Sequence, residues 1–169
     1  MLSRLKELIP RTEHWPKFVE NTSQQFEASF SMVKIQDNPV RPSVFFHGMN
    51  GSTLPIVVSH GEGRVHLSLL NSLQELSEPG MIPVRYVDNR LSVTEQYPYN
   101  PNGSPAGVAG VSSEDGRVLA VMPHPERTSW QTWVATYHRK SWKNGVNLAR
   151  GSGCSEVLVS GWDRQAFKI

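Results

Sequence analysis

The sequence has one cysteine, no long apolar run and no cluster of charge of one sign. With Cys154 alone, no disulfide can form within the chain. No stretch approaches the roughly 18–20 apolar residues that a membrane-spanning helix needs. Residues 1–10 mix charges with leucines, whereas a secretion signal has an apolar centre. We therefore expect a cytoplasmic protein without a membrane partner.

Charged residues make up 19% of the 169 residues, and the formal net charge is +2. The Lys and Arg residues are scattered along the chain, whereas binding to nucleic-acid phosphates needs a concentrated basic face. We expect no nucleic-acid partner. The hydrophobic share of 38% and the length are sufficient for one folded domain with a core.

Short apolar segments alternate with turns rich in Gly, Pro and Asn. Their periodicity predicts strands over residues 26–35, 55–59, 65–67, 83–88, 92–97, 107–112 and 117–122, and helices over 2–9 and 69–76. The continuous apolar run at 55–59 predicts a strand that is buried on both faces. Turns are expected at 60–64, 100–105 and 114–116.

The segment after the last predicted strand holds the clearest candidate site. Pro123 and Pro125 flank His124, and proline stiffens the backbone on both sides. In an extended segment Glu126 faces the same way as His124, so its carboxylate can fix the tautomer of the imidazole. His124 and Glu126 are therefore candidate catalytic residues, although a structural histidine at a strand end fits the spacing equally.

Other site types find less support in the sequence. A zinc deaminase also uses H-x-E but needs a downstream P-C-x-x-C, and Cys154 stands alone. No phosphate-binding loop motif is present. The segment 60–64 is either a binding loop or a turn that ends a strand. The histidines without partners at metal-ligand spacing are His14, His47, His66 and His138, and we expect no metal site.

Several segments in order resemble the glutaminase domain of the large, single-chain type of phosphoribosylformylglycinamidine synthase. They are LKELIP (5–10), WPKFV (15–19), NTS (21–23), FEA (26–28), PIVVSHGEGR (55–64), RYVDN (85–89), YPYNPNGSP (97–105) and MPHPER (122–127). The resemblance covers residues 1–127 and leaves 128–169 as a divergent, unassigned tail. It implies an α/β fold of the class I glutamine amidotransferase (flavodoxin-like) type, with a mixed sheet flanked by helices.

The resemblance also implies a reaction. A cysteine attacks the side-chain amide of glutamine, His124 acts as the base, and Glu126 orients the imidazole. The released ammonia passes to a synthetase domain of the same enzyme family, which uses ATP and Mg to convert formylglycinamide ribonucleotide to formylglycinamidine ribonucleotide in purine biosynthesis. No cofactor is expected in this chain itself.

The chain departs from the family pattern at the nucleophile. In the family the cysteine precedes the histidine, on an elbow that would lie upstream of Met1, so we expect that elbow and the N-terminal strands to be absent. Cys154 follows His124, in the unmatched tail, and is not assigned as the nucleophile. The chain alone is expected to be inactive. A non-catalytic docking or regulatory module and a decayed gene fragment are the alternative interpretations. Ser29 and Glu20 also stand where the family usually has arginine.

Overall fold

The computed structural model describes residues 15–37, 43–67, 73–77 and 80–127, together with Ile9 and Thr12. The helix predicted over 2–9, apart from Ile9, and the tail 128–169 with Cys154 lie outside the described residues. Within the described ranges, no helix has the length and apolar character needed to cross a membrane.

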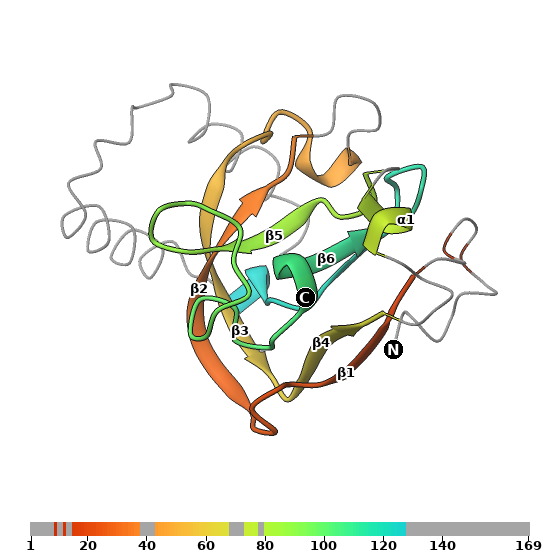
Figure 1. Cartoon of the computed structure of the whole chain (residues 1–169). Coiled ribbons are helices and arrows are strands. Elements are labelled where there is room, and N and C mark those ends of the chain that lie inside the picture. Colours follow the sequence, from red (N-terminus) through yellow and green to blue (C-terminus); the bar gives the residue numbers. More distant parts are fainter. Residues whose placement is uncertain are drawn as a thin grey trace.

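Among the described residues, seven strands form two antiparallel sheets (Figure 1). The smaller sheet pairs β1 (Lys17–Glu20) with β4 (Glu62–His66). The larger sheet has the order β3-β2-β5-β6-β7. Its strands are β2 (Glu27–Ile35), β3 (Thr53–His60), β5 (Val84–Val87), β6 (Val108–Ser112) and β7 (Leu119–Val121). One short α-helix, α1 (Leu73–Ser77), and three 3-10 turns complete the described elements: η2 (Val44–Phe46), η3 (Pro105–Gly107) and η4 (Pro125–Arg127).

The larger sheet curls until its two ends meet. His124, three residues after β7, forms an antiparallel bridge with Val57 of β3, and its N–H donates to the Val57 carbonyl at 2.7 Å. Figure 1 shows the cyan η4 turn lying against β3. The chain thereby brings the segment after its last described strand next to a strand that lies some sixty residues earlier.

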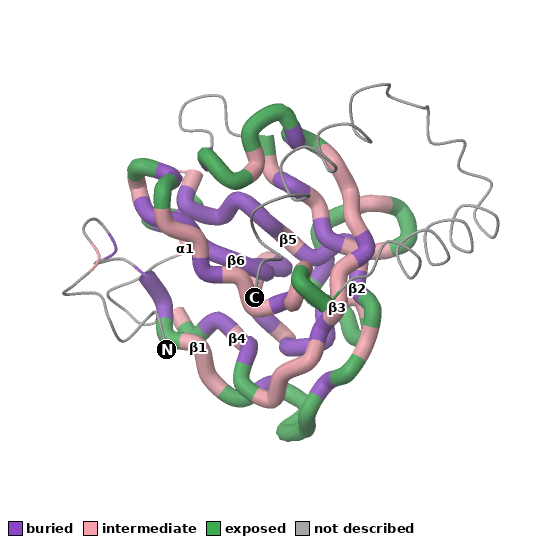
Figure 2. Tube along the Cα trace, turned by 180° about the vertical axis from the view of Figure 1, so that it is seen from behind, coloured by how far each residue is buried: buried purple, intermediate pink, exposed green. Residues whose placement is uncertain are grey.

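Two clusters of buried side chains hold these elements together (Figure 2). One cluster joins the strands of the larger sheet and consists of Val33, Ile35, Met49, Val58, Val84, Tyr86 and Ala109. The other joins β4 and α1 to β6 and β7 and consists of Trp15, Val65, Leu76, Met81, Ile82, Val108, Val111 and Ala120. Successive residues of a strand point to opposite faces of the sheet, and β6, which is buried along its whole length, contributes to both clusters: Val108 and Val111 to one and Ala109 to the other.

Most of the predicted strands are confirmed. The runs 26–35, 83–88, 107–112 and 117–122 contain β2, β5, β6 and β7, and the turn at 114–116 joins the last two. The helix predicted over 69–76 is confirmed in α1 (Leu73–Ser77), and residues 69–72 of the prediction lie outside the described residues. The turn predicted at 60–64 is wrong in extent, because only Gly61 separates β3 from β4.

Two strand predictions need correction. Residues 92–97 do not form a regular strand, and among them Val93 makes only an isolated bridge to Val87. The strand at 55–59 exists as β3, but it is not buried on both faces: only Pro55 and Val58 are fully buried. The physical reason is that β3 is an end strand of the sheet, where fewer neighbouring elements cover it, so each of its faces has half-buried residues beside one buried residue.

Candidate active site

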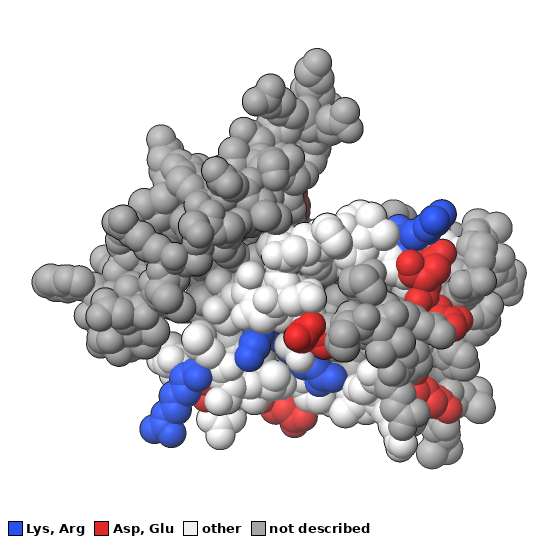
Figure 3. All heavy atoms as spheres, turned by 90° about the horizontal axis from the view of Figure 1, so that it is seen from above, with Lys and Arg blue, Asp and Glu red and all other residues white. Residues whose placement is uncertain are grey.

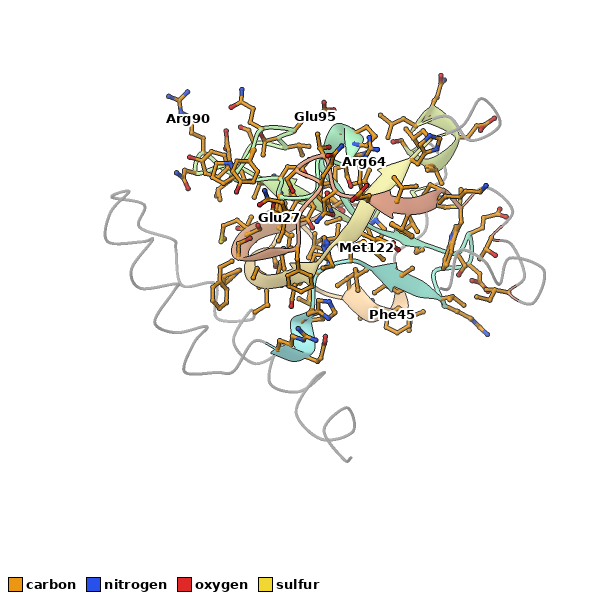
Figure 4. All side chains as sticks on the ribbon, turned by 90° about the horizontal axis from the view of Figure 1, so that it is seen from below. Glu27, Phe45, Arg64, Arg90, Glu95 and Met122 are labelled. Carbon is orange, nitrogen blue, oxygen red and sulfur yellow. The ribbon has the colours of Figure 1, made fainter. Side chains whose placement is uncertain are left out.

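His124 and Glu126 meet side chain to side chain. The Nδ1 atom of His124 lies 2.7 Å from Oε1 of Glu126. The prediction of an extended segment is wrong, because Pro125 opens the 3-10 turn η4 and the Arg127 N–H donates to the His124 carbonyl at 3.1 Å. A single turn therefore returns the carboxylate to the imidazole. Figure 4 marks Met122, which leads from β7 into this turn.

Arg127 fastens the turn to β3. Its Nη1 donates to the Ser59 hydroxyl at 2.5 Å, while its Nε lies 3.8 Å from the Glu126 carboxylate. Together with the backbone bond from His124 to Val57, this contact gives η4 two attachments to one strand. The carboxylate is thus held between the guanidinium and the imidazole that it orients.

The geometry assigns different tasks to the two ring nitrogens of His124. With the Nδ1 proton donated to Glu126, Nε2 is the nitrogen that is able to accept a proton from another group. The His124 side chain is 29% exposed and Glu126 is 58% exposed, so water screens their attraction. The contribution of the pair is therefore orientation more than stability.

A second histidine, His60, ends β3 and is unusual in its surroundings. Both of its ring nitrogens are buried and have no hydrogen-bond partner among the described residues. Its ring lies against Gly63, where an added Cβ would overlap the imidazole. Glycine at 63 is therefore what allows the ring to occupy this position. Of the two interpretations of residues 60–64, a binding loop or a turn that ends a strand, the second agrees with the end of β3 at His60.

Two buried asparagines hold the bend at 60–63. Asn21 donates from Nδ2 to the His60 carbonyl at 2.8 Å and accepts at Oδ1 from the Gly63 N–H at 3.1 Å. The backbone N–H of Asn21 donates to the Gly61 carbonyl at 2.9 Å. From the other side, Nδ2 of Asn102 donates to the Gly63 carbonyl at 2.8 Å. These bonds join residues about forty positions apart, so no local pattern in the sequence predicts them.

The pKa of His60 is lowered from its ordinary value of 6.5, first by burial and second by the nearby His124. Glu27, at the start of β2 and labelled in Figure 4, acts in the opposite direction. Burial disfavours the charged imidazole, and a like charge on His124 disfavours it further. His60 is therefore neutral at pH 7 and offers one donor and one acceptor nitrogen.

We expect NMR titration of the imidazole protons to give His60 a midpoint below 6.5. Replacing His124 by alanine should move that midpoint upward, because one of its two lowering causes is removed. The folded state binds fewer protons at His60 than the unfolded chain, so its contribution to stability is present above pH 6.5 and is lost as pH falls from 6.5 through the lower pKa of the folded state. His66→Ala, at an exposed histidine of β4, is the control and should leave the His60 midpoint unchanged. A midpoint above 6.5, or no response to His124→Ala, would contradict the described surroundings.

Charge and metal ligands add little to this site. On the face seen in Figure 3, Lys and Arg side chains lie beside Asp and Glu side chains rather than gathering by sign. In the part of the chain that the structure describes, no group of three or more His, Cys, Asp or Glu side chains is placed to hold a metal ion.

The fold and the pair define a domain that carries a carboxylate-oriented histidine three residues after its last described strand, an arrangement found in acid–base enzymes. The family model described as CobB/CobQ-like glutamine amidotransferase domain matches residues 1–150. The chain therefore belongs to the CobB/CobQ-like glutamine amidotransferase domain family. Among solved structures, a chain of "Structure of PurLQS from Thermotoga maritima" is similar, with 24% sequence identity and a TM-score of 0.49. That match covers 76% of this chain and 50% of the other, so this chain spans half the length of the matched one.

Membership of the family confirms the predicted glutamine amidotransferase domain and its fold class. Within the described residues, the strands pair antiparallel and α1 is the one α-helix. The match to the family model, over residues 1–150, includes His124 and Glu126 and ends before Cys154. The roles of these residues stay predictions, and the bonded geometry of the pair is the observation that supports them.

Proposed function

We propose that this chain is the glutaminase portion of a phosphoribosylformylglycinamidine synthase, which acts in the cytoplasm in purine biosynthesis. The observation that carries the proposal is the 2.7 Å contact between His124 and Glu126 inside a glutamine amidotransferase domain. The ordered segments from residues 5–10 to 122–127 support the particular synthase within that family. Glutamine is the substrate, and the synthetase domain that receives the ammonia is the partner.

The chemistry follows from the free nitrogen of His124. A cysteine thiol gives its proton to Nε2, and the resulting thiolate attacks the side-chain amide carbon of glutamine. The protonated imidazole, stabilised by Glu126, then gives the proton to the departing nitrogen as the C–N bond breaks. Water hydrolyses the thioester to glutamate, and ammonia is released. The synthetase domain uses ATP and Mg to transfer this ammonia to formylglycinamide ribonucleotide.

The 169-residue chain alone should not hydrolyse glutamine. Its single cysteine, Cys154, lies beyond the residues that match the family, so the described pair has no assigned nucleophile. We expect glutamate release at the rate of the buffer control, measured with a coupled glutamate dehydrogenase assay. Glutamate release above background that disappears in His124→Ala would show that the chain is active without a further partner, and would overturn the inactivity proposal.

A further inference from the structure

His60, the last residue of β3, occupies a position that suits a neutral ring only. Both of its ring nitrogens are buried, and neither has a hydrogen-bond partner within the part of the chain that the structure describes. The ring also lies so close to Gly63 that this residue has no room for a side chain. A buried neutral imidazole without partners costs some stability, whereas a buried charge without partners costs far more. Uptake of a proton therefore makes this position of the ring unfavourable.

Charged groups on the neighbouring elements do not compensate for a charge on His60. Glu27 of β2 is its direct partner in the register of β2 and β3, so the two side chains share one face of the sheet. The pKa of His60 is lowered first by burial and second by His124, and the attraction to Glu27 is too weak to reverse this. On β4, Glu62 is exposed, and Arg64 donates from Nε to a carbonyl of β1. The protonated ring is therefore not held in place by an opposite charge.

The ring covers the bonds that hold the bend at 60–63. Asn21 accepts from the Gly63 N–H at Oδ1 and donates from Nδ2 to the His60 carbonyl, so one buried side chain joins both ends of the bend. Because the ring lies against Gly63, its departure opens this N–H to water. Water competes with a hydrogen bond once it reaches the donor. The bend therefore loses its protection when the ring leaves.

We propose that His60 is a pH-sensitive switch: when it takes up a proton, its ring leaves Gly63, the bend at 60–63 opens, and the attachment of η4 to β3 loosens. The attachment is affected because Ser59, the neighbour of His60 in β3, accepts the bond from Arg127. The switch concerns the conformation of this chain and does not depend on the proposed function.

The test follows the His60 ring by NMR in the full 169-residue chain between about pH 7.5 and about pH 5. At the higher pH, nuclear Overhauser effects should join the ring protons to the Hα protons of Gly63. At the lower pH we expect these effects to fall at least threefold. Contacts between Val33 and Tyr86, which pair in the larger sheet, should persist because the opening is local and the core stays folded.

Amide exchange gives a second readout of the opening. After correction for its intrinsic pH dependence, exchange at Gly63 and Arg127 should accelerate about three- to thirtyfold at the lower pH. The upper limit follows because one proton, taken up with the ordinary pKa of 6.5, shifts an equilibrium by at most about thirtyfold at pH 5. A larger acceleration at Gly63 would require further protons and would overturn a switch made by His60 alone.

Three variants assign the response to the His60 ring. His60→Gln keeps a polar side chain that does not titrate, so exchange at Gly63 should be equal at both pH values. His66→Gln, at an exposed histidine of β4, is the matched control and should keep the full response. His124→Ala should weaken the response, because the closed position tolerates a protonated ring better without a second positive charge. Circular dichroism checks that each variant folds, and His124→Ala decides if His60→Gln does not.

The outcomes that contradict the switch are distinct. A His60 ring that titrates while its Overhauser effects to Gly63 persist would show that the charge is accommodated in place. That result, an undiminished response in His60→Gln, or a full response in His124→Ala would each overturn the proposal. Faster exchange at Gly63 without faster exchange at Arg127 would uphold the opening of the bend and overturn its reach to η4.

Discussion

Replacing Trp15 by alanine is expected to lower the free energy of unfolding by about 3–5 kcal/mol, the range for large aromatic residues in a core. Trp15 is fully buried, and its indole Nε1 donates to the Ser112 carbonyl at 2.8 Å, a bond that spans 97 residues. It belongs to the cluster that joins β4 and α1 to the larger sheet. The alanine variant loses this packing and leaves a buried carbonyl without its donor. Chemical denaturation followed by tryptophan fluorescence and circular dichroism measures the loss.

Trp15→Phe separates packing from hydrogen bonding. Phenylalanine retains most of the aromatic volume but cannot donate to Ser112, so we expect a loss of about 1–3 kcal/mol. Equal losses in the two variants would show that the hydrogen bond, and not the cluster, carries the effect of Trp15.

A cooperative transition in the unchanged chain would also argue against a decayed gene fragment, because a decayed chain has no single folded state to lose.

Asn21→Ala is expected to cost about 2–4 kcal/mol of unfolding free energy and to release the bend at 60–63. The Asn21 side chain is 2% exposed and makes three hydrogen bonds, to the carbonyls of His60 and Gln25 and from the N–H of Gly63. Alanine leaves those buried backbone groups unpaired. Loss of the three Asn21 hydrogen bonds, here called the Asn21 clamp, also frees the His60 ring. Amide exchange should therefore accelerate at Gly63.

The matched control for this prediction is Asn89→Ala. Asn89 donates from Nδ2 to the Tyr99 hydroxyl at 2.9 Å, but this bond is exposed to solvent. Water replaces an exposed partner at little cost, so we expect a change below about 0.5 kcal/mol. If the two asparagine variants lost the same stability, the burial of the clamp would not be what makes Asn21 important.

The strands were predictable because alternation and short apolar runs are local properties of the sequence. The prediction failed at 92–97 because other local bonds replace the ladder there. The carboxylate of Asp88 accepts from the N–H groups of Arg90 and Ser92, and Leu91 has a φ of 63°. Side-chain bonds to nearby backbone compete with strand pairing, and a left-handed residue redirects the chain. Apolar alternation does not reveal either effect.

In the candidate site too, contacts between residues close in sequence were predictable and contacts between distant residues were not. His124 and Glu126 are two positions apart, so their contact was open to local reasoning, although through a turn and not an extended segment. The anchors on Val57 and Ser59 lie more than sixty residues earlier and depend on how the sheet curls. The buried, unpartnered ring of His60 was equally hidden, because burial and the neighbourhood of His124 arise only in the folded chain.

The bridge between His124 and Val57 has a practical consequence for any study of the site. The bond runs from the amide of one residue to the carbonyl of the other, so it does not involve either side chain. An alanine or glutamine at 124 therefore removes the imidazole while the backbone seam that closes the sheet stays in place. At position 124 the imidazole and the backbone bond to Val57 can therefore be tested separately.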